Sequence, residues 1–264
     1  MRVTVDDAAI DVATDGSGEP VVLIHGFPLS REIWDPQVEK LAQHMLTIRP
    51  DLRGMGRSSV PDGPYLMETL AGDIAAVLDT LGIERATIVG HSLGGYVAMA
   101  FCRMYTERVN RLALVCSKLA ADSPEAAKNR EELADRAERE GRMDPIVDAF
   151  VPRLFATATL EERAPAVTQA RALALKNDPR GAGAMLRGMA QRVDSYDIAE
   201  ELAMPVLIVA GAGDQNVKLG EAEEVRRAFP HAELRVMHRS GHVPMLEEPE
   251  ALSEALLEFA AGGR

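Results

Sequence analysis

The sequence predicts an α/β protein with a mostly parallel sheet, helices on both faces of that sheet and an inserted all-helical segment. Two observations support this class. Apolar runs suited to buried strands alternate with helical patterns along most of the chain, as in parallel strands joined by right-handed crossover helices. Between about residues 118 and 197 the alternation stops, and apolar residues recur only at helical spacing. The 264 residues suffice for one large domain with such an insertion.

The N-terminal half predicts a hairpin, three strand–helix units and a further strand. Residues 1–19 alternate apolar and polar side chains, as in a two-stranded hairpin. The continuous apolar run 20–25 suits a strand that is buried on both faces. The helix expected at 66–81 carries one apolar stripe, and Gly82 closes it as a C-cap glycine would. The other elements expected here are a helix at 31–44, strands at 45–50, 86–91 and 109–115, and a helix at 96–104.

The insertion and the C-terminal part complete the domain organisation. Proline and glycine residues divide the stretch 118–197 into about four helices. We therefore assign residues 1–117 and 198–264 to one α/β core and residues 118–197 to the insertion. In the second part of the core the alternation resumes, with strands at 204–211 and 233–237 and helices at 220–229 and 250–260.

The composition excludes several classes of function. The net charge is −12, from 29 basic and 41 acidic residues, which disfavours nucleic acid and anionic membrane surfaces as partners. No apolar run reaches the length of a membrane span, and the N-terminus has no apolar signal core, so a cytoplasmic protein is expected. Cys102 and Cys116 lie in apolar segments, which favours core residues in a reducing compartment over a disulfide or a zinc site.

A serine between two glycines stands where the strand 86–91 meets a helix. The run Gly90-His91-Ser92-Leu93-Gly94 fits the Gly-x-Ser-x-Gly pattern of a nucleophile elbow. The glycines lack Cβ atoms, so the strand and the helix can approach each other closely around a strained serine. The pattern alone also fits an ordinary turn with a solvated hydroxyl, so the catalytic interpretation depends on the rest of the chain.

Three side chains with complementary chemistry follow predicted strands. They are Ser92, Asp214 and His242, in this order along the chain. In an open α/β sheet, chemistry takes place at the carboxyl ends of the strands, so these side chains should meet at one edge. A serine needs a base to take its proton, and the base needs an acceptor that fixes its tautomer. The three residues are therefore the predicted catalytic serine, acid and base.

Other residues compete for two of these roles. His238 is the nearest competitor for the base, but His242 lies in a glycine-containing loop that can turn its imidazole toward Ser92. Asp122 is the competitor for the acid, but it lies farther from its strand than Asp214 does. The remaining histidines, expected at surface or packing positions, are His25, His44, His91 and His231.

An acyl-transfer serine also needs backbone donors for the negative charge that develops on the carbonyl oxygen. The N–H of Leu93, at the start of the helix after Ser92, is one candidate. The N–H of Phe27 is the other, because Gly26 lets the backbone approach a substrate and Pro28 has no N–H to offer.

Together these segments resemble the α/β-hydrolase fold family. The resemblance covers nearly the whole chain and rests on the motifs around the residues named above and on the segment 51–58. It implies that the insertion 118–197 is a helical cap over the site. Within the family the chain is similar to 3-oxoadipate enol-lactonase-like proteins and small-ester carboxylesterases, through the compact cap and the run 187–195.

The resemblance also predicts an arginine in the cap, and the sequence departs from the family pattern after Asp214. Enol-lactonases handle a carboxylated substrate, so a cap arginine is expected near the site. Relatives often carry a proline soon after the acid, whereas this chain continues from Asp214 with Gln-Asn-Val-Lys, which weakens the prediction of the local turn but keeps the acid. The available cap arginines, among which the sequence does not choose, are Arg153, Arg171, Arg187 and Arg192.

The expected function is hydrolysis of carboxylic esters or lactones through an acyl-enzyme on Ser92. The substrate is a small molecule, and neither a metal nor an organic cofactor is implied. Cleavage of C–C bonds and cofactor-free perhydrolysis use the same three residues and stay open. A ligand-binding module that keeps the fold without catalysis is the alternative from another class. The sequence does not predict an oligomeric state.

Overall fold

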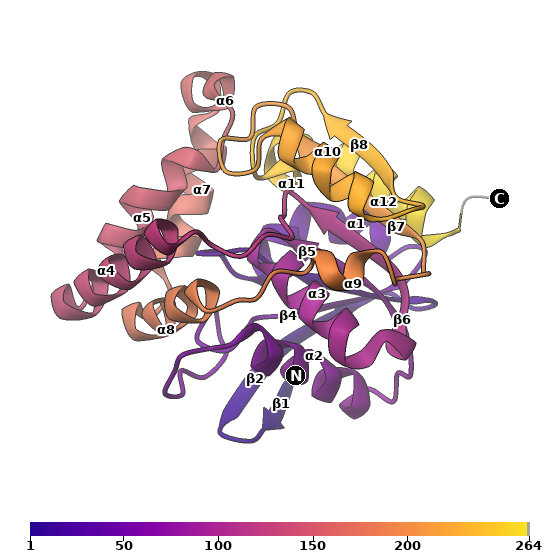
Figure 1. Ribbon diagram of the computed structural model, residues 1–264, viewed down its shortest axis with the longest axis horizontal. Coiled ribbons are helices and arrows are strands. Elements are labelled where there is room, and N and C mark those ends of the chain that lie inside the picture. Colours follow the sequence, from indigo (N-terminus) through magenta and orange to yellow (C-terminus); the bar gives the residue numbers. More distant parts are fainter. Residues whose placement is uncertain (263–264) are drawn as a thin grey trace.

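A single sheet organises the part of the chain that the computed structural model describes, residues 1–262, and it contains eight strands there (Figure 1). The strands are β1 (Arg2–Val5), β2 (Ala8–Asp15), β3 (Pro20–Ile24), β4 (Leu46–Pro50), β5 (Ala86–His91), β6 (Val109–Val115), β7 (Val206–Gly211) and β8 (Glu233–Met237). Their order in the sheet is β1-β2-β4-β3-β5-β6-β7-β8. β2 pairs antiparallel with both β1 and β4, and every later pair is parallel. The predicted fold class is confirmed.

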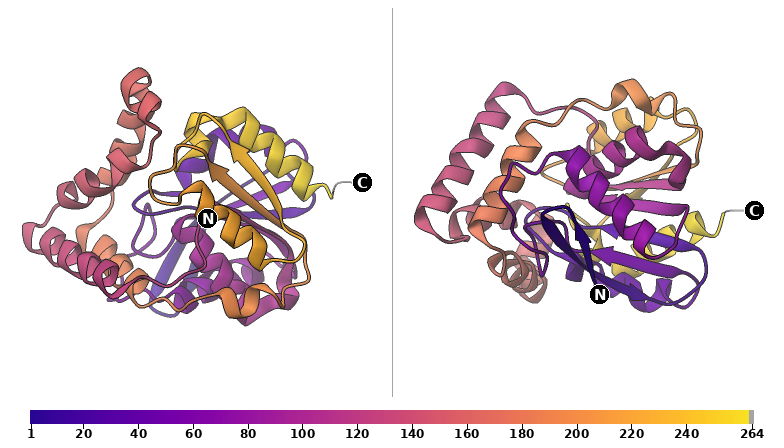
Figure 2. Two further views of the ribbon diagram at one scale, coloured as in Figure 1. Left: turned by 45° about the horizontal axis from the view of Figure 1, so that its top comes forward. Right: turned by 90° about the horizontal axis from the view of Figure 1, so that it is seen from below.

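Helices cover both faces of the sheet (Figures 1 and 2). Helix α2 packs against α3, whereas α1 packs against α11 and α12. All six residues of β5 are buried between these layers, which explains its continuous apolar run. The helices of the core are α1 (Asp35–Leu41), α2 (Met67–Thr80), α3 (Leu93–Tyr105), α10 (Leu219–Ala228), α11 (Pro244–Glu247) and α12 (Pro249–Ala260).

Two helices of the core differ from the expectation. The stretch 31–44 forms a short 3-10 helix at Arg31–Trp34 and then α1, which ends at Leu41. The division falls just before Pro36, which has no N–H and is tolerated only in the first turn of an α-helix. Helix α11 was not predicted, because its four residues are too few to show a periodic pattern.

The insertion is helical throughout. Its longest helix, α4, packs against α8. In Figures 1 and 2 the helices α4 to α8 stand together at the side of the sheet opposite the C-terminus. More helices form than the expected four, because the stretch between Pro145 and Pro165 divides into α5 and α6 and because a further short helix, α9, follows α8. The helices are α4 (Pro124–Glu140), α5 (Asp144–Phe150), α6 (Thr157–Glu162), α7 (Ala164–Leu175), α8 (Pro179–Ala190) and α9 (Tyr196–Ala199), with a 3-10 helix at Val151–Arg153.

The last of these helices, α9, belongs spatially with the core. Arg103 of α3 forms an ion pair with Asp197 of α9 at 2.6 Å. Figure 1 shows α9 beside α3 and away from α4 to α8. The predicted boundaries at residues 118 and 197 stay a prediction.

One buried side chain joins the insertion to two loops of the core. Asn177, between α7 and α8, donates from Nδ2 to the carbonyl of Pro28 at 2.8 Å, and its Oδ1 accepts from the N–H of Gly56 at 2.7 Å. Nearby, the N–H of Tyr65 donates to the carbonyl of Ala184 in α8 at 3.1 Å. The insertion is therefore fastened to the loops that follow β3 and β4.

Within residues 1–262 no helix is both long enough and apolar enough to cross a membrane. Cys102 and Cys116 are free and buried. Burial raises the pKa of the Cys102 thiol to about 12 and that of the Cys116 thiol above its ordinary value.

Candidate active site

The turn from β5 to α3 holds Ser92 in a strained conformation. Its φ is +51° and its ψ is −111°, a combination of backbone angles that residues with a Cβ atom rarely adopt. A Cβ at Gly90 would lie 2.3 Å from the carbonyl oxygen of Gly94, and a Cβ at Gly94 would lie 2.4 Å from that of Ile24. The two glycines therefore permit the close approach of strand and helix that the sequence motif predicts.

We expect Gly94→Ala to destabilise the fold and Gly72→Ala to stabilise it. The added methyl group at Gly94 meets backbone, which can only shift, so the free energy of unfolding should fall by about 1–3 kcal/mol. Gly72 lies inside α2, where an added methyl group would meet no other segment of the chain within 4 Å, so alanine should raise the free energy of unfolding by about 0.5–1 kcal/mol. Urea unfolding measures both changes, and equal effects of the two substitutions would contradict the proposed tight contact at the elbow.

Asp214 and His242 lie in neighbouring loops, after β7 and β8, and form a buried pair. His242 Nδ1 lies 2.7 Å from Asp214 Oδ2. Because a carboxylate only accepts, Nδ1 carries a proton, so in the neutral ring Nε2 has a free lone pair. The other oxygen of Asp214 accepts from the N–H groups of Asn216 at 2.7 Å and Val217 at 3.0 Å. The chain thus makes the turn after Asp214 without the proline that relatives often carry.

The pKa of Asp214 shows that the carboxylate form is favoured in this position. Burial alone would raise that pKa. The opposing effects of the His242 charge, the His242 hydrogen bond and the two backbone N–H groups outweigh burial, so the pKa lies below its ordinary value. Asp214 is therefore an anion that can orient an imidazole and stabilise its protonated form.

His91, which precedes Ser92, holds the backbone of His242. It is fully buried, and its Nε2 lies 2.8 Å from the carbonyl oxygen of His242. Burial, and next the proximity of His242, lower the pKa of His91 to about 3, so its ring is neutral. Its single N–H must then donate to His242, and its Nδ1 has no hydrogen-bond partner among the described residues. His91 is a packing residue, as expected, but one that also connects the elbow to the His242 loop.

Ser92 and His242 line the same pocket, which has a volume of about 670 Å³. Its walls come from both parts of the chain: Phe27 and Tyr96 from the core, and Leu133 and Phe150 among others from the insertion. Among the hydrogen bonds of residues 1–262, none joins Ser92 Oγ to His242. Such contacts are often long without substrate and tighten when it binds.

The two predicted backbone donors lie close to this pocket. Phe27 lines it, and its ring packs edge-on against Phe150 with the ring centroids 5.0 Å apart. Leu93 is the first residue of α3, where an N–H has no partner within the helix. Within residues 1–262, neither the Phe27 N–H nor the Leu93 N–H donates to a backbone acceptor. The two N–H groups therefore stay the predicted donors to a bound oxygen atom.

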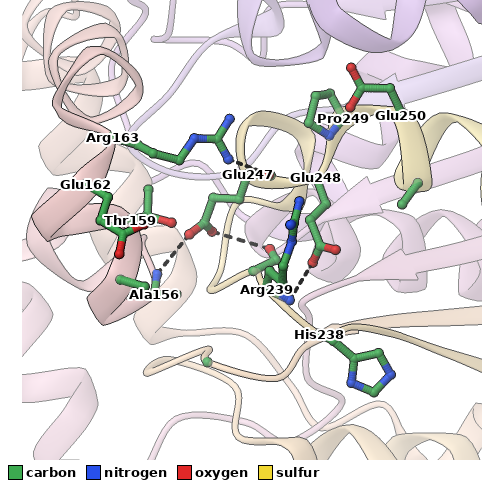
Figure 3. A pocket seen from close by; sticks show the side chains of 14 residues that line it. Ala156, Thr159, Glu162, Arg163, His238, Arg239, Glu247, Glu248, Pro249 and Glu250 are labelled. Carbon is green, nitrogen blue, oxygen red and sulfur yellow. Dashed lines mark hydrogen bonds between the residues drawn. The ribbon is translucent and has the colours of Figure 1, made fainter.

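The competing residues lie in other surroundings. His238 is exposed and lines a separate cavity of about 740 Å³, shown in Figure 3, which neither Ser92 nor Asp214 nor His242 lines. Asp122 does line the Ser92 pocket, but it is paired with Arg192 at 2.8 Å and with Arg130. Burial would raise the pKa of Asp122, and these two arginines lower it.

The four cap arginines separate into two groups. Arg171 forms an ion pair with Asp148, and Arg187 forms ion pairs with Glu138 and with two other carboxylates of α4. Neither arginine lines the pocket. Arg192 lines the pocket but is committed to Asp122 and lies 4.2 Å from the ring centroid of Tyr96. Arg153 lines the pocket, and its side chain is exposed and forms no ion pair within residues 1–262.

One group of possible metal ligands occurs within residues 1–262. Donor atoms of Cys116, Asp214 and His242 all lie within 4.8 Å of one another. A thiol must lose its proton to bind a metal, and burial opposes this at Cys116. The proton between His242 and Asp214 would also have to leave. These residues therefore fit a hydrogen-bonded pair beside a thiol better than they fit a metal centre.

Sequence reasoning missed Glu247, a carboxylate that is 2% exposed and lies five residues after His242. One of its oxygen atoms accepts a hydrogen bond from the insertion, and the other accepts one from the loop that carries His242. A signal was present, because Glu247 follows the apolar residues Pro244, Met245 and Leu246, where a charged side chain is unusual.

Comparison with known proteins gives matches over most of the chain. The model of a family described as alpha/beta hydrolase fold matches residues 19–249. A thermophilic esterase from Thermogutta terrifontis is 36% identical, with a TM-score of 0.95 over 98% of this chain and 97% of that one. The enol-lactonase from Burkholderia xenovorans LB400 is 27% identical, with a TM-score of 0.92 over 99% and 100%. The 3-oxoadipate enol-lactonase 2 of Acinetobacter baylyi is 27% identical over 96% of this chain and 94% of its own length.

Proposed function

The chain belongs to the α/β-hydrolase fold family, and from this premise we propose that it is a serine hydrolase that cleaves carboxylic esters, including lactones. One observation carries the proposal. A buried hydrogen bond joins His242 Nδ1 to Asp214 Oδ2 at 2.7 Å, so in the neutral ring Nε2 has a free lone pair, and His242 lines the same pocket as Ser92. This is the arrangement that a serine needs in order to act as a nucleophile.

In the first half of the proposed reaction, Ser92 Oγ attacks the ester carbonyl carbon while His242 Nε2 takes the hydroxyl proton. The N–H groups of Phe27 and Leu93 donate to the oxyanion that forms. Asp214 stabilises the protonated imidazole and does not itself take up a proton. The tetrahedral intermediate then breaks its C–O bond, and the leaving alkoxide receives the proton from His242. An acyl group remains on Ser92.

In the second half, His242 takes a proton from water, and the resulting hydroxide oxygen attacks the acyl carbon. The second tetrahedral intermediate expels Ser92 Oγ, which regains its proton from His242. The products are a carboxylic acid and an alcohol. With a lactone, the two groups stay in one molecule, because the ring bond is the one that breaks.

The residues that line the pocket indicate which ester substrates would fit it. Apolar side chains such as Phe27, Leu133 and Phe150 favour a compact apolar group. Arg153 adds an uncommitted guanidinium at the pocket, which would suit a carboxylated acid or lactone such as an enol-lactone. The esterase and the enol-lactonases to which the chain is similar support both kinds of substrate.

The test is a comparison of substrates on the purified protein. We expect turnover of short-chain aryl acetates and of a dienelactone-type substrate, and slow or no cleavage of a 1,3-diketone. Faster cleavage of the diketone would indicate a C–C bond hydrolase, and peroxide-dependent oxidation of halide in the presence of acetate would indicate a perhydrolase. A protein that cleaves none of these and forms no adduct with a fluorophosphonate would be a non-catalytic module.

A further inference from the structure

Glu247 is a buried charge that the proposed reaction does not use. Its carboxylate has three hydrogen-bond donors, and Figure 3 labels one of them, Ala156. Oε1 accepts from the N–H of Ala156 at 2.9 Å, and Oε2 accepts from the N–H of Gly241 at 2.7 Å and from the hydroxyl of Ser240 at 3.3 Å. Because each oxygen atom accepts a hydrogen bond from a backbone N–H, the carboxylate has the partners that a buried charge requires.

The two backbone donors belong to different parts of the chain. Ala156 stands at the start of α6 in the insertion, whereas Gly241 directly precedes His242. The two backbones are also in direct contact, since a Cβ at Gly241 would lie 2.4 Å from the nitrogen of Ala156. One carboxylate therefore joins the insertion to the loop that carries His242.

His242 itself is bound on both sides of its backbone. Its N–H donates to the carbonyl of Leu154 in the insertion at 2.8 Å, and its carbonyl accepts from His91 Nε2 at 2.8 Å. The insertion also contacts α11 directly, through Arg163 Nη1, which donates to the carbonyl of Glu247 at 2.6 Å. The position of the imidazole thus depends on how the insertion is seated on the loop.

We propose that Glu247 is a positioning residue, which fixes the imidazole of His242 by fastening its loop to the insertion at Ala156. The inference rests on the proposed function, because it takes His242 as the base. Without the carboxylate, the N–H groups of Ala156 and Gly241 are buried with no acceptor. The loop and the insertion then separate or rearrange to reach water, and His242 loses its alignment with Ser92. Misplacement of about 1 Å is enough to slow a reaction about 100-fold.

The decisive variant is Glu247→Gln. It keeps the size of the side chain but turns one acceptor into an NH₂ group, which then faces an N–H donor. We expect kcat on an aryl acetate, and the rate of labelling by a fluorophosphonate, to fall about 10- to 100-fold, with KM changed less than about threefold. Rates are divided by the number of active sites, counted by the burst of product or by bound phosphonate.

Glu248→Gln is the matched control. Glu248 is the next residue, and its Oε2 accepts from the backbone N–H of Arg239 at 2.8 Å, so the substitution also removes a carboxylate acceptor from an N–H group nearby. Within residues 1–262 the side chain of Glu248 forms no hydrogen bond with the insertion. We expect kcat and labelling in this variant to stay within about threefold of the unaltered protein.

A spectroscopic readout separates positioning from general loss of stability. The proton between His242 Nδ1 and Asp214 Oδ2 should give a far-downfield NMR signal, identified by its absence in Asp214→Asn. We expect the signal to weaken or exchange faster in Glu247→Gln and to stay unchanged in Glu248→Gln. An unchanged signal and an unchanged kcat per active site in Glu247→Gln, with only a lower melting temperature, would overturn the proposal.

If Glu247→Gln does not fold, Glu247→Asp is used in its place. The aspartate side chain keeps the charge but is shorter by one methylene group, so it cannot reach both backbone donors. The same expectations apply to it, and full kcat per active site would again overturn the positioning role. If the unaltered protein shows neither ester turnover nor labelling, the proposed function fails, whereas the NMR signal still tests whether Glu247 positions His242.

Discussion

Replacing Ser92 with alanine should reduce kcat for aryl ester hydrolysis by at least about 10⁴-fold, because no covalent route remains. The unaltered protein should also gain the mass of a phosphonyl group on Ser92 when it is treated with a fluorophosphonate, as Ser92 Oγ displaces fluoride from phosphorus. The alanine variant should gain none. Initial-rate kinetics and peptide mass spectrometry measure the two effects.

Ser253→Ala is a suitable control for this experiment. Ser253 is also a buried serine, but its hydroxyl donates to the carbonyl of Pro249 in α12 at 2.7 Å, away from the pocket. Hydrolysis in this variant should equal that of the unaltered protein. The assignment of Ser92 would be wrong if Ser92→Ala folded with the same melting temperature and still cleaved the ester at the original rate.

Replacing Asp214 with asparagine should lower kcat by about 10⁴-fold while the pocket keeps its shape. The asparagine amide can donate to His242 Nδ1, so the ring proton would move to Nε2, where it blocks removal of the Ser92 proton. Asp122→Asn is the comparison, because Asp122 is the other acid considered for the role. There we expect a change of less than about tenfold in kcat, since Asp122 pairs with arginines and not with a histidine.

Asp214→Asn should also lower the melting temperature, by an amount that depends on pH. The pKa of Asp214 is lower in the folded protein than its ordinary value of 3.8, so the carboxylate stabilises the fold above that pH, and the contribution is lost as the pH falls through the folded pKa. Asp214→Asn should therefore lower the melting temperature most near neutral pH and least in acid. A difference that grew on acidification would contradict the assigned direction.

The catalytic candidates could be predicted from sequence because each follows a strand of a recognisable type. Ser92 is marked by its flanking glycines, and Asp214 and His242 follow apolar runs that must end at the same edge of a parallel sheet. Strand positions were predicted to within about one or two residues for the same reason, since buried parallel strands are continuous apolar runs. The choice of His242 over His238 agrees with the hydrogen bond to Asp214, although its catalytic role stays a prediction.

The supporting contacts could not be predicted, because they join residues far apart in the sequence. The bond from His91 to the carbonyl of His242 spans 151 positions, and that from Glu247 to Ala156 spans 91. Neither has a local pattern, and the bond to Ala156 also depends on how the insertion packs against the core. The helices of the insertion were also harder to divide, since α6 and α9 have six and four residues and show less than two turns of periodicity each.

The single amide of Asn177, which binds both Pro28 and Gly56, bears on how this protein could acquire new substrates. An insertion transplanted from a relative would have to reproduce both that bridge and the contact with the His242 loop. Otherwise it would not pack correctly against the core. Point substitutions at side chains that face the pocket, such as Leu133 and Phe150, leave both attachments intact. Directed evolution of the substrate range should therefore succeed through such single positions more readily than through exchange of whole segments.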